Sequence, residues 1–230
     1  MIYKMGFIEI SLILLVVITL IFIFLAAFVF FKNDSAPTPT PTENDSFELN
    51  VEVIDLTYEF LISSMGTLVS LDIDWGDGTT ETYTEENSPL ILTHTYSSSG
   101  NYVIKGTNVK NYVNLSNYFS APVVNKIKSV KINNMKILKV LTIYDSLLTN
   151  LTITGLKQLV EMNIQQNTLT QESIDNILIT FNNFNTTYEI GTDGGTIDLS
   201  NQNPPSPPSA SGLAAKAELE SRNWTVIVDP

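Results

Sequence analysis

The chain has 230 residues, with 24 acidic against 12 basic side chains and a net charge of −12. This balance excludes nucleic acid as the main partner, because phosphate binding needs a clustered positive field. Cysteine is absent, which excludes a disulfide framework, a thiolate metal site and a cysteine nucleophile. The single histidine, His94, excludes metal sites built from several histidines.

An uncharged apolar run covers residues 10–31 near the N-terminus. As a helix it is about 33 Å long, which matches the roughly 30 Å hydrocarbon core of a bilayer. A cleaved signal peptide is the alternative, but its apolar core is usually about 7–15 residues long and ends in small residues. Ala26 and Ala27 are followed here by Phe-Val-Phe-Phe, which makes a poor cleavage site. We therefore expect residues 1–32 to be an uncleaved single-pass transmembrane anchor.

A proline-rich linker and a series of short strands are predicted next. Residues 33–47 contain alternating proline and threonine and should be extended. From Glu48 onward, short runs alternate apolar and polar side chains, as in Leu49, Val51 and Val53. Alternation of this kind, interrupted by Gly, Ser and Asp, is typical of antiparallel strands with one buried face. The sequence therefore predicts a β-sandwich over residues 48–116.

Two local motifs stand out within this segment. The first is a hairpin motif, in which Asp77-Gly78 supplies the positive φ of a tight turn and Trp75 supplies a large buried surface. The second contains a strand, a Ser/Gly turn and another strand. The motif residues are Trp75, Gly76, Asp77, Gly78, His94, Tyr96, Gly100 and Tyr102.

In order and spacing, the two motifs resemble the W-G-D-G-T, H-x-Y and G-x-Y-x-V segments of the polycystic-kidney-disease (PKD) domain family. The resemblance covers about residues 47–109, with Ile104 in the place of the final Val. It implies an immunoglobulin-like sandwich, usually extracellular, that serves as a spacer or contacts proteins and glycans. The part of the chain after the membrane anchor could lie outside or in the cytoplasm, and the resemblance implies that this C-terminal part is exposed outside. The family closes with one more strand, for which residues 112–115 are the candidate.

The period changes after this segment. Six positions recur at an offset of 21 residues: Met135, Leu138, Leu141, Ile143, Ser146 and Leu148 correspond to Leu156, Leu159, Met162, Ile164, Asn167 and Leu169. The second set resembles the leucine-rich-repeat phrase and the 21-residue repeats of bacterial internalins. The resemblance implies strands that bury their apolar residues and an Asn that bonds the backbone of a turn. Two coils cannot bury their own faces, so they need caps.

The remaining residues are expected to cap this repeat. Residues 171–184 place four apolar side chains on one helical face, with Thr170 as the N-cap. A strand over 196–200, a helix over 211–222 and a strand over 224–228 should follow. We thus expect a mainly β fold with an N-terminal transmembrane helix, a PKD-like sandwich, and a leucine-rich-repeat-like unit over 117–230 that has an αβαβ C-terminal cap.

Three carboxylates near the hairpin motif are candidate calcium ligands. Asp72, Asp74 and Asp77 have a spacing that fails the EF-hand pattern. We therefore expect them to cap the hairpin, with calcium binding as the alternative. For His94 we expect a structural role, with its ring bonded near the hairpin.

A lysine-rich block is a candidate interaction patch. Its members are Lys126, Lys128, Lys131, Lys136 and Lys139. These lysines either lie on solvated strand faces and turns, or they face the acidic residues of the sandwich or an anionic partner.

No catalytic motif is recognised in the sequence, so we expect neither an enzyme nor a cofactor. The first functional hypothesis is a surface protein for adhesion, ligand binding or display, with a protein or glycan partner. The second is a membrane-anchored structural, spike or minor capsid protein of a lipid-containing virus, whose partners are neighbouring capsid or envelope proteins. An accessory unit of a surface hydrolase is a third, less favoured hypothesis. Oligomers are compatible with each of them.

Overall fold

The computed structural model describes residues 45–64, 70–84, 89–109, 111–117, 125–156, 158–187 and 194–230. All of them belong to one compact unit, Glu43–Pro230. The predicted membrane anchor and the linker up to residue 44 lie outside the described residues. Among the helices that are described, none is long and apolar enough to cross a membrane.

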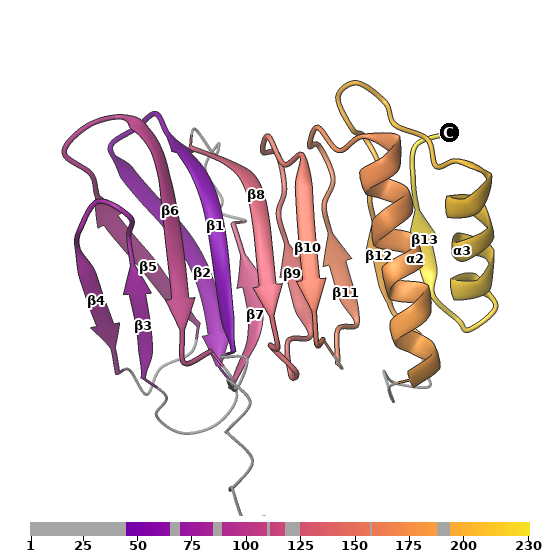
Figure 1. The fold of residues 1–230 in the computed structure, drawn as a ribbon, viewed down its shortest axis with the longest axis horizontal. Helices are drawn as coiled ribbons and strands as arrows, with labels where there is room; N and C mark the ends of the chain where they lie inside the picture. Colours follow the sequence, from indigo (N-terminus) through magenta and orange to yellow (C-terminus); the bar gives the residue numbers. More distant parts are fainter. Residues whose placement is uncertain are drawn as a thin grey trace, which may run out of the picture. The chain divides into compact units, whose positions relative to one another are not determined.

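The fold is mainly β, as predicted, with two mixed sheets (Figure 1). We call the first sheet A, and its strands lie in the order β10 (Asn150–Thr154), β8 (Lys126–Asn133), β1 (Ser46–Val53), β6 (Gly100–Thr107), β3 (Leu71–Asp74), β4 (Thr80–Tyr83). The second, sheet B, has the order β13 (Thr225–Ile227), β12 (Thr196–Asp198), β11 (Glu161–Asn163), β9 (Val140–Thr142), β7 (Tyr112–Ser116), β2 (Thr57–Ser64), β5 (Leu90–Thr95).

Antiparallel pairing dominates residues 45–116, which we call the antiparallel half. Alternation in β1 buries Phe47, Leu49, Val51 and Val53 and leaves the residues between them partly exposed. Its core contains Trp75, which is fully buried and meets Phe60 edge-on at 5.9 Å. The alternating pattern therefore marks the buried face of the sheet correctly in β1.

Parallel coils make up residues 125–230, which we call the parallel half. The predicted offset of 21 residues is the register between two strands, because Leu141 of β9 lies opposite Met162 of β11. All twelve positions of the predicted repeat are buried. In sheet A, β8 and β10 pair in parallel at the same offset, with Val130 opposite Leu151. Each of these coils thus contributes one strand to either sheet.

Helices replace the sheet A strand in the last coils (Figure 1). Helix α2 (Gln171–Thr187) buries Ile174, Ile177, Leu178 and Phe181, as predicted, and its first turn is capped where Ser173 N donates to Thr170 Oγ1 at 3.2 Å. Helix α3 (Ala210–Glu220) packs against α2 and β13. The predicted order of helix, strand, helix and strand is therefore confirmed.

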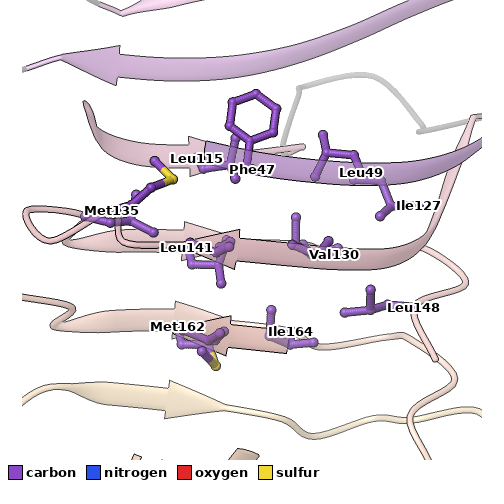
Figure 2. Close-up of a cluster of buried hydrophobic side chains, with 14 of the residues drawn as sticks. Phe47, Leu49, Leu115, Ile127, Val130, Met135, Leu141, Leu148, Met162 and Ile164 are labelled. Carbon is purple, nitrogen blue, oxygen red and sulfur yellow. The ribbon is translucent and has the colours of Figure 1, made fainter. Parts of the chain in front are cut away.

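The two halves share both sheets and one hydrophobic core. In sheet A, β1 pairs antiparallel with both β6 and β8. In sheet B, β7 pairs antiparallel with β2 and parallel with β9. Figure 2 shows Phe47 and Leu49 of β1 in the same cluster as Val130, Leu141 and other residues of the parallel half. Both sheets therefore continue across the predicted boundary between residues 116 and 117.

Candidate functional site

The hairpin between β3 and β4 is held by its own aspartates. Trp75 N donates to Thr79 O at 3.1 Å, and Gly76 N donates to Asp74 Oδ1 at 2.9 Å. Asp77 Oδ1 accepts from Thr79 N at 3.0 Å and from Thr79 Oγ1 at 2.6 Å. Gly76 has a φ of +81°, and a Cβ added there would lie 2.6 Å from the carbonyl oxygen of Val103 in β6. Only glycine therefore fits this turn against its neighbouring strand.

His94 joins this hairpin to sheet B. Its Nε2 lies 2.8 Å from Asp77 Oδ2, and its ring stacks on Trp75 with the centroids 4.7 Å apart. Tyr96 meets the imidazole edge-on at 4.6 Å and donates its hydroxyl to Trp75 O at 2.9 Å. Because the side chains of His94 and Asp77 are only 10% and 17% exposed, the group is a structural clasp between the two sheets.

The turn before β6 completes this cluster. Tyr102 stacks on Tyr96 with the centroids 4.0 Å apart, and its hydroxyl donates to Ser98 O at 2.8 Å. Gly100 starts the strand, where an added Cβ would lie 3.6 Å from the Tyr102 ring. Gly78 has open space around its Cβ position but a φ of +96°. The structure thus brings the two predicted motifs together at one end of the antiparallel half.

Electrostatics within the clasp favour a charged Asp77. Burial on its own raises the pKa of this carboxyl, but hydrogen bonds from Thr79 and His94, with the charge of His94, outweigh it and lower the pKa to about 2. Burial raises the pKa of the Tyr58 and Tyr96 hydroxyls, so both phenols stay neutral. The clasp therefore holds the Asp77 carboxylate beside the un-ionised Tyr96.

The three candidate calcium ligands do not converge. Asp72 accepts from Thr82 Oγ1 at 2.7 Å and from the side-chain amide of Asn108. Asp74 caps Gly76, whereas Asp77 bonds Thr79 and His94. Within the described part of the chain, no three carboxylate or imidazole groups are placed to hold a metal ion. Asp74 and Asp77 thus cap backbone amides of the hairpin, as expected, whereas Asp72 bonds side chains of β4 and of the turn after β6.

The candidate lysine patch is divided between strand β8 and the loop that follows it. Lys126 Nζ lies 3.3 Å from Asp145 Oδ1, and Lys128 Nζ lies 3.2 Å from Glu52 Oε2. Lys131 faces Glu48 across the β1–β8 pair. Lys136 and Lys139 lie in the loop that follows β8. The three lysines on β8 therefore face acidic residues of their own chain.

Alternating charges run across the outer surface of sheet A. The registers place Lys131 of β8 opposite Glu48 of β1, Glu48 opposite Lys105 of β6, and Lys105 opposite Asp74 of β3. Opposite charges in directly facing positions each stabilise a sheet by about 0.2–1 kcal/mol. This row therefore favours the register that joins the two halves.

A ladder of side-chain amides runs through the turns of the parallel half. Asn167 is fully buried, accepts from Leu148 N at 3.1 Å, and donates to Ile143 O at 2.7 Å in the preceding coil. Gln202 repeats the arrangement one coil later, with Leu169 N as donor and Ile164 O as acceptor. Asn167 fits the bonding expected from the repeat.

Two members of this network were not predicted. Besides Gln202, the buried Asp229 accepts backbone hydrogen bonds from Asn201, Gln202 and Ser206. The carboxylate thereby satisfies donors of the long loop before α3, and it closes the ladder at the last strand. The sequence does not reveal that these two polar residues are buried, because neither of them follows the 21-residue spacing.

The outer face of sheet B in the parallel half is the candidate contact surface. It alternates with the buried row of Leu141, Met162 and Ile197. We define it by the two outward rows on β9, β11, β12 and β13: Thr142, Asn163, Asp198 and Ile227, and Val140, Glu161, Thr196 and Thr225. Asp198 is fixed by Gln165 Nε2 at 2.6 Å and Ser200 Oγ at 2.7 Å. The face thus presents hydroxyl, amide, carboxylate and aliphatic groups, and hydrogen bonds hold the Asp198 carboxylate in place.

Comparisons with protein-family models, with curated proteins and with solved structures found no match to this chain.

Proposed function

We propose that this chain is a non-catalytic, single-pass membrane protein that displays a rigid β-scaffold outside the membrane for adhesion or ligand binding. The observation that carries the proposal is the outer face of sheet B, where four strands hold eight outward positions in register as two rows. Such a surface suits recognition of an extended protein or glycan, because the shared sheets and the buried amide ladder fix its geometry before binding.

The proposal includes an assignment of the two halves. We propose that residues 48–116 are a PKD-like sandwich, supported by the meeting of Trp75, His94 and Tyr96. We propose that residues 117–230 are a leucine-rich-repeat-like unit with an αβαβ cap, supported by the 21-residue register and by Asn167. In this arrangement the sandwich caps the first coil and the helices flank the last ones.

Membrane anchoring is tested on the full-length chain. The protein should remain in the membrane pellet after alkaline carbonate extraction, and protease added outside intact cells should digest its C-terminal part. Replacing Leu20 and Ile21 by arginine should release it, since each arginine at the helix centre costs about 2.5–3.5 kcal/mol. A wild-type protein that carbonate removes from membranes would contradict the anchor.

Binding is tested with a photo-crosslinking amino acid at Asn163, on the outer face of sheet B. The matched control carries the same amino acid at Thr152, on the outer face of sheet A. Crosslinks to a cell-surface protein or glycan from Asn163 and not from Thr152 support the proposal. Crosslinks to capsid or envelope proteins in purified particles favour the viral structural role instead, and equal yields from both positions contradict a binding face on sheet B.

A further inference from the structure

Strand β5 is an open edge of sheet B. It pairs antiparallel with β2 on one side, and no described strand pairs with its other side. It is six residues long and contains neither a proline nor a charged carboxylate, lysine or arginine. Ile91 on its outer surface is 54% exposed. Proteins usually protect a long edge strand with charges, prolines or bulges, because an unprotected one pairs with another strand.

The corresponding edge of sheet A is protected. Strand β4 is only four residues long and carries Glu81, which faces Ile73 across the β3–β4 pair and so lies on the inward side of the strand. An inward-pointing charge is one of the devices that block edge pairing. The Glu81 carboxylate also accepts the hydroxyl of Tyr83. The contrast singles out β5 among the two edges at this end of the molecule.

The backbone groups that β5 offers follow from its register with β2. Tyr96 N donates to Leu56 O at 2.8 Å in the same register that places His94 opposite Tyr58. Hydrogen-bonded pairs alternate along an antiparallel ladder, so the even-numbered residues of β5 bond β2. Ile91, Thr93 and Thr95 therefore direct their N–H and C=O groups toward the open edge.

We infer that β5 pairs antiparallel with β5 of a second copy of this chain, about a two-fold axis at Thr93. The strand starts after Pro89, which has no N–H to offer, and the chain bends at Ser97. Within those limits, an axis at Thr93 pairs Thr93 with Thr93 of the second copy, and it pairs Ile91 of each copy with Thr95 of the other. This register uses every outward-facing backbone group of β5, and a shift to a neighbouring register leaves some of them unpaired.

Side chains fit the same register. Thr93 meets its own counterpart, and facing threonines are a favourable cross-strand pair. The exposed Ile91 gains the methyl group of Thr95 as its neighbour, which reduces its contact with water. The result is a dimer whose two B sheets form one continuous sheet, and this inference does not depend on the proposed function.

Because the chain has no cysteine, single substitutions test the register directly. In the purified full-length chain in detergent micelles, Thr93→Cys should form a disulfide-linked dimer under mild oxidation. Hydrogen-bonded antiparallel partners have Cα atoms about 5.5 Å apart, within the range that a disulfide spans. Thr95→Cys is the matched control, since its counterpart lies four residues away in register, about 13 Å. Mixing Ile91→Cys with Thr95→Cys should restore the crosslink.

A second variant separates pairing from folding. Thr93→Pro removes the N–H at the centre of the proposed interface but no backbone hydrogen bond to β2. The side-chain bond from Thr93 Oγ1 to Glu59 Oε1 that is also lost is exposed and long, at 3.3 Å, so the monomer should fold. Its dimer fraction in sedimentation equilibrium should fall at least tenfold below that of the wild type, with an unchanged circular dichroism spectrum. The inference is overturned if Thr95→Cys crosslinks as readily as Thr93→Cys, or if Thr93→Pro dimerises like the wild type.

Discussion

Removal of the Asn167 side chain is the most informative test of the parallel half. The side chain is fully buried and donates to the carbonyls of Ile143, Ile164 and Gln165, while it accepts from Leu148 N. Asn167→Ala leaves Leu148 N and Ile143 O without this partner, whereas Ile164 O keeps Gln202 Nε2 and Gln165 O keeps Asp145 N as donors. An unsatisfied buried group costs about 1–3 kcal/mol. Because some of the groups relax toward other partners, we expect a loss of about 3–5 kcal/mol in the free energy of unfolding.

Urea unfolding of the full-length chain in detergent micelles measures this loss through tryptophan fluorescence, to which Trp224 contributes from the parallel half. This residue is 4% exposed and meets Phe181 edge-on at 6.4 Å. The control is Glu161→Ala, on the exposed outer face of sheet B, which should change the stability by less than about 0.5 kcal/mol. If Asn167→Ala and Glu161→Ala differ by less than about 1 kcal/mol, the amide ladder does not stabilise the coils.

Three further predictions concern the antiparallel half and its junction with the coils. Gly76→Ala should cost several kcal/mol by thermal melting, about 3 or more, because the added methyl group meets the β6 backbone at a positive φ; equal melting temperatures would contradict the close approach. Asp77, with its pKa lowered to about 2, stabilises the fold above about pH 4. The advantage of the wild type over Asp77→Asn should therefore be about 1 kcal/mol at neutral pH and vanish as the pH falls from about 4 to about 2; a pH-independent difference would exclude this linkage. Lys131→Glu should cost about 0.5–1 kcal/mol in urea unfolding, and adding Glu48→Lys should recover only part of it, since Lys105 faces position 48 from the other side; no loss in the single variant would mean that the charge row is unimportant.

Local patterns predicted the elements whose environment repeats along the chain. The helical face of α2 was predicted because Ile174, Ile177, Leu178 and Phe181 follow the period of a helix that is buried on one side. The strands β9 and β11 were predicted because one coil buries the same positions as the next. In both cases the burial depends on neighbours that are close in sequence, so the sequence contains the signal.

Strand β2 was missed because its outer surface is not polar throughout. Tyr58, Phe60 and Ile62 alternate inward, but Leu61 lies between two of them on the outer side and breaks the polar alternation. Period-two patterns reveal a strand only when its second face contacts water. A strand with apolar residues on both faces requires knowledge of its neighbours.

Long-range pairings also lay beyond the sequence pattern. The junction pairs Glu48 with Lys131, and neither residue shows locally which strand it will face. Gln202 follows Asn167 in the ladder at a spacing set by α2 and the loops around it, so the 21-residue offset cannot find it. The lysine block is visible in the composition, but its division between ion pairs on β8 and a separate loop depends on the fold.

The position of β1 has a mechanical consequence. Its eight residues are bonded to β6 on one side and to β8 on the other, both antiparallel. Tension applied to the chain ahead of Ser46, along the strand axis, loads both rows of hydrogen bonds in shear, so that many must break together. The pull is shared at once between the two halves, and neither one peels away first.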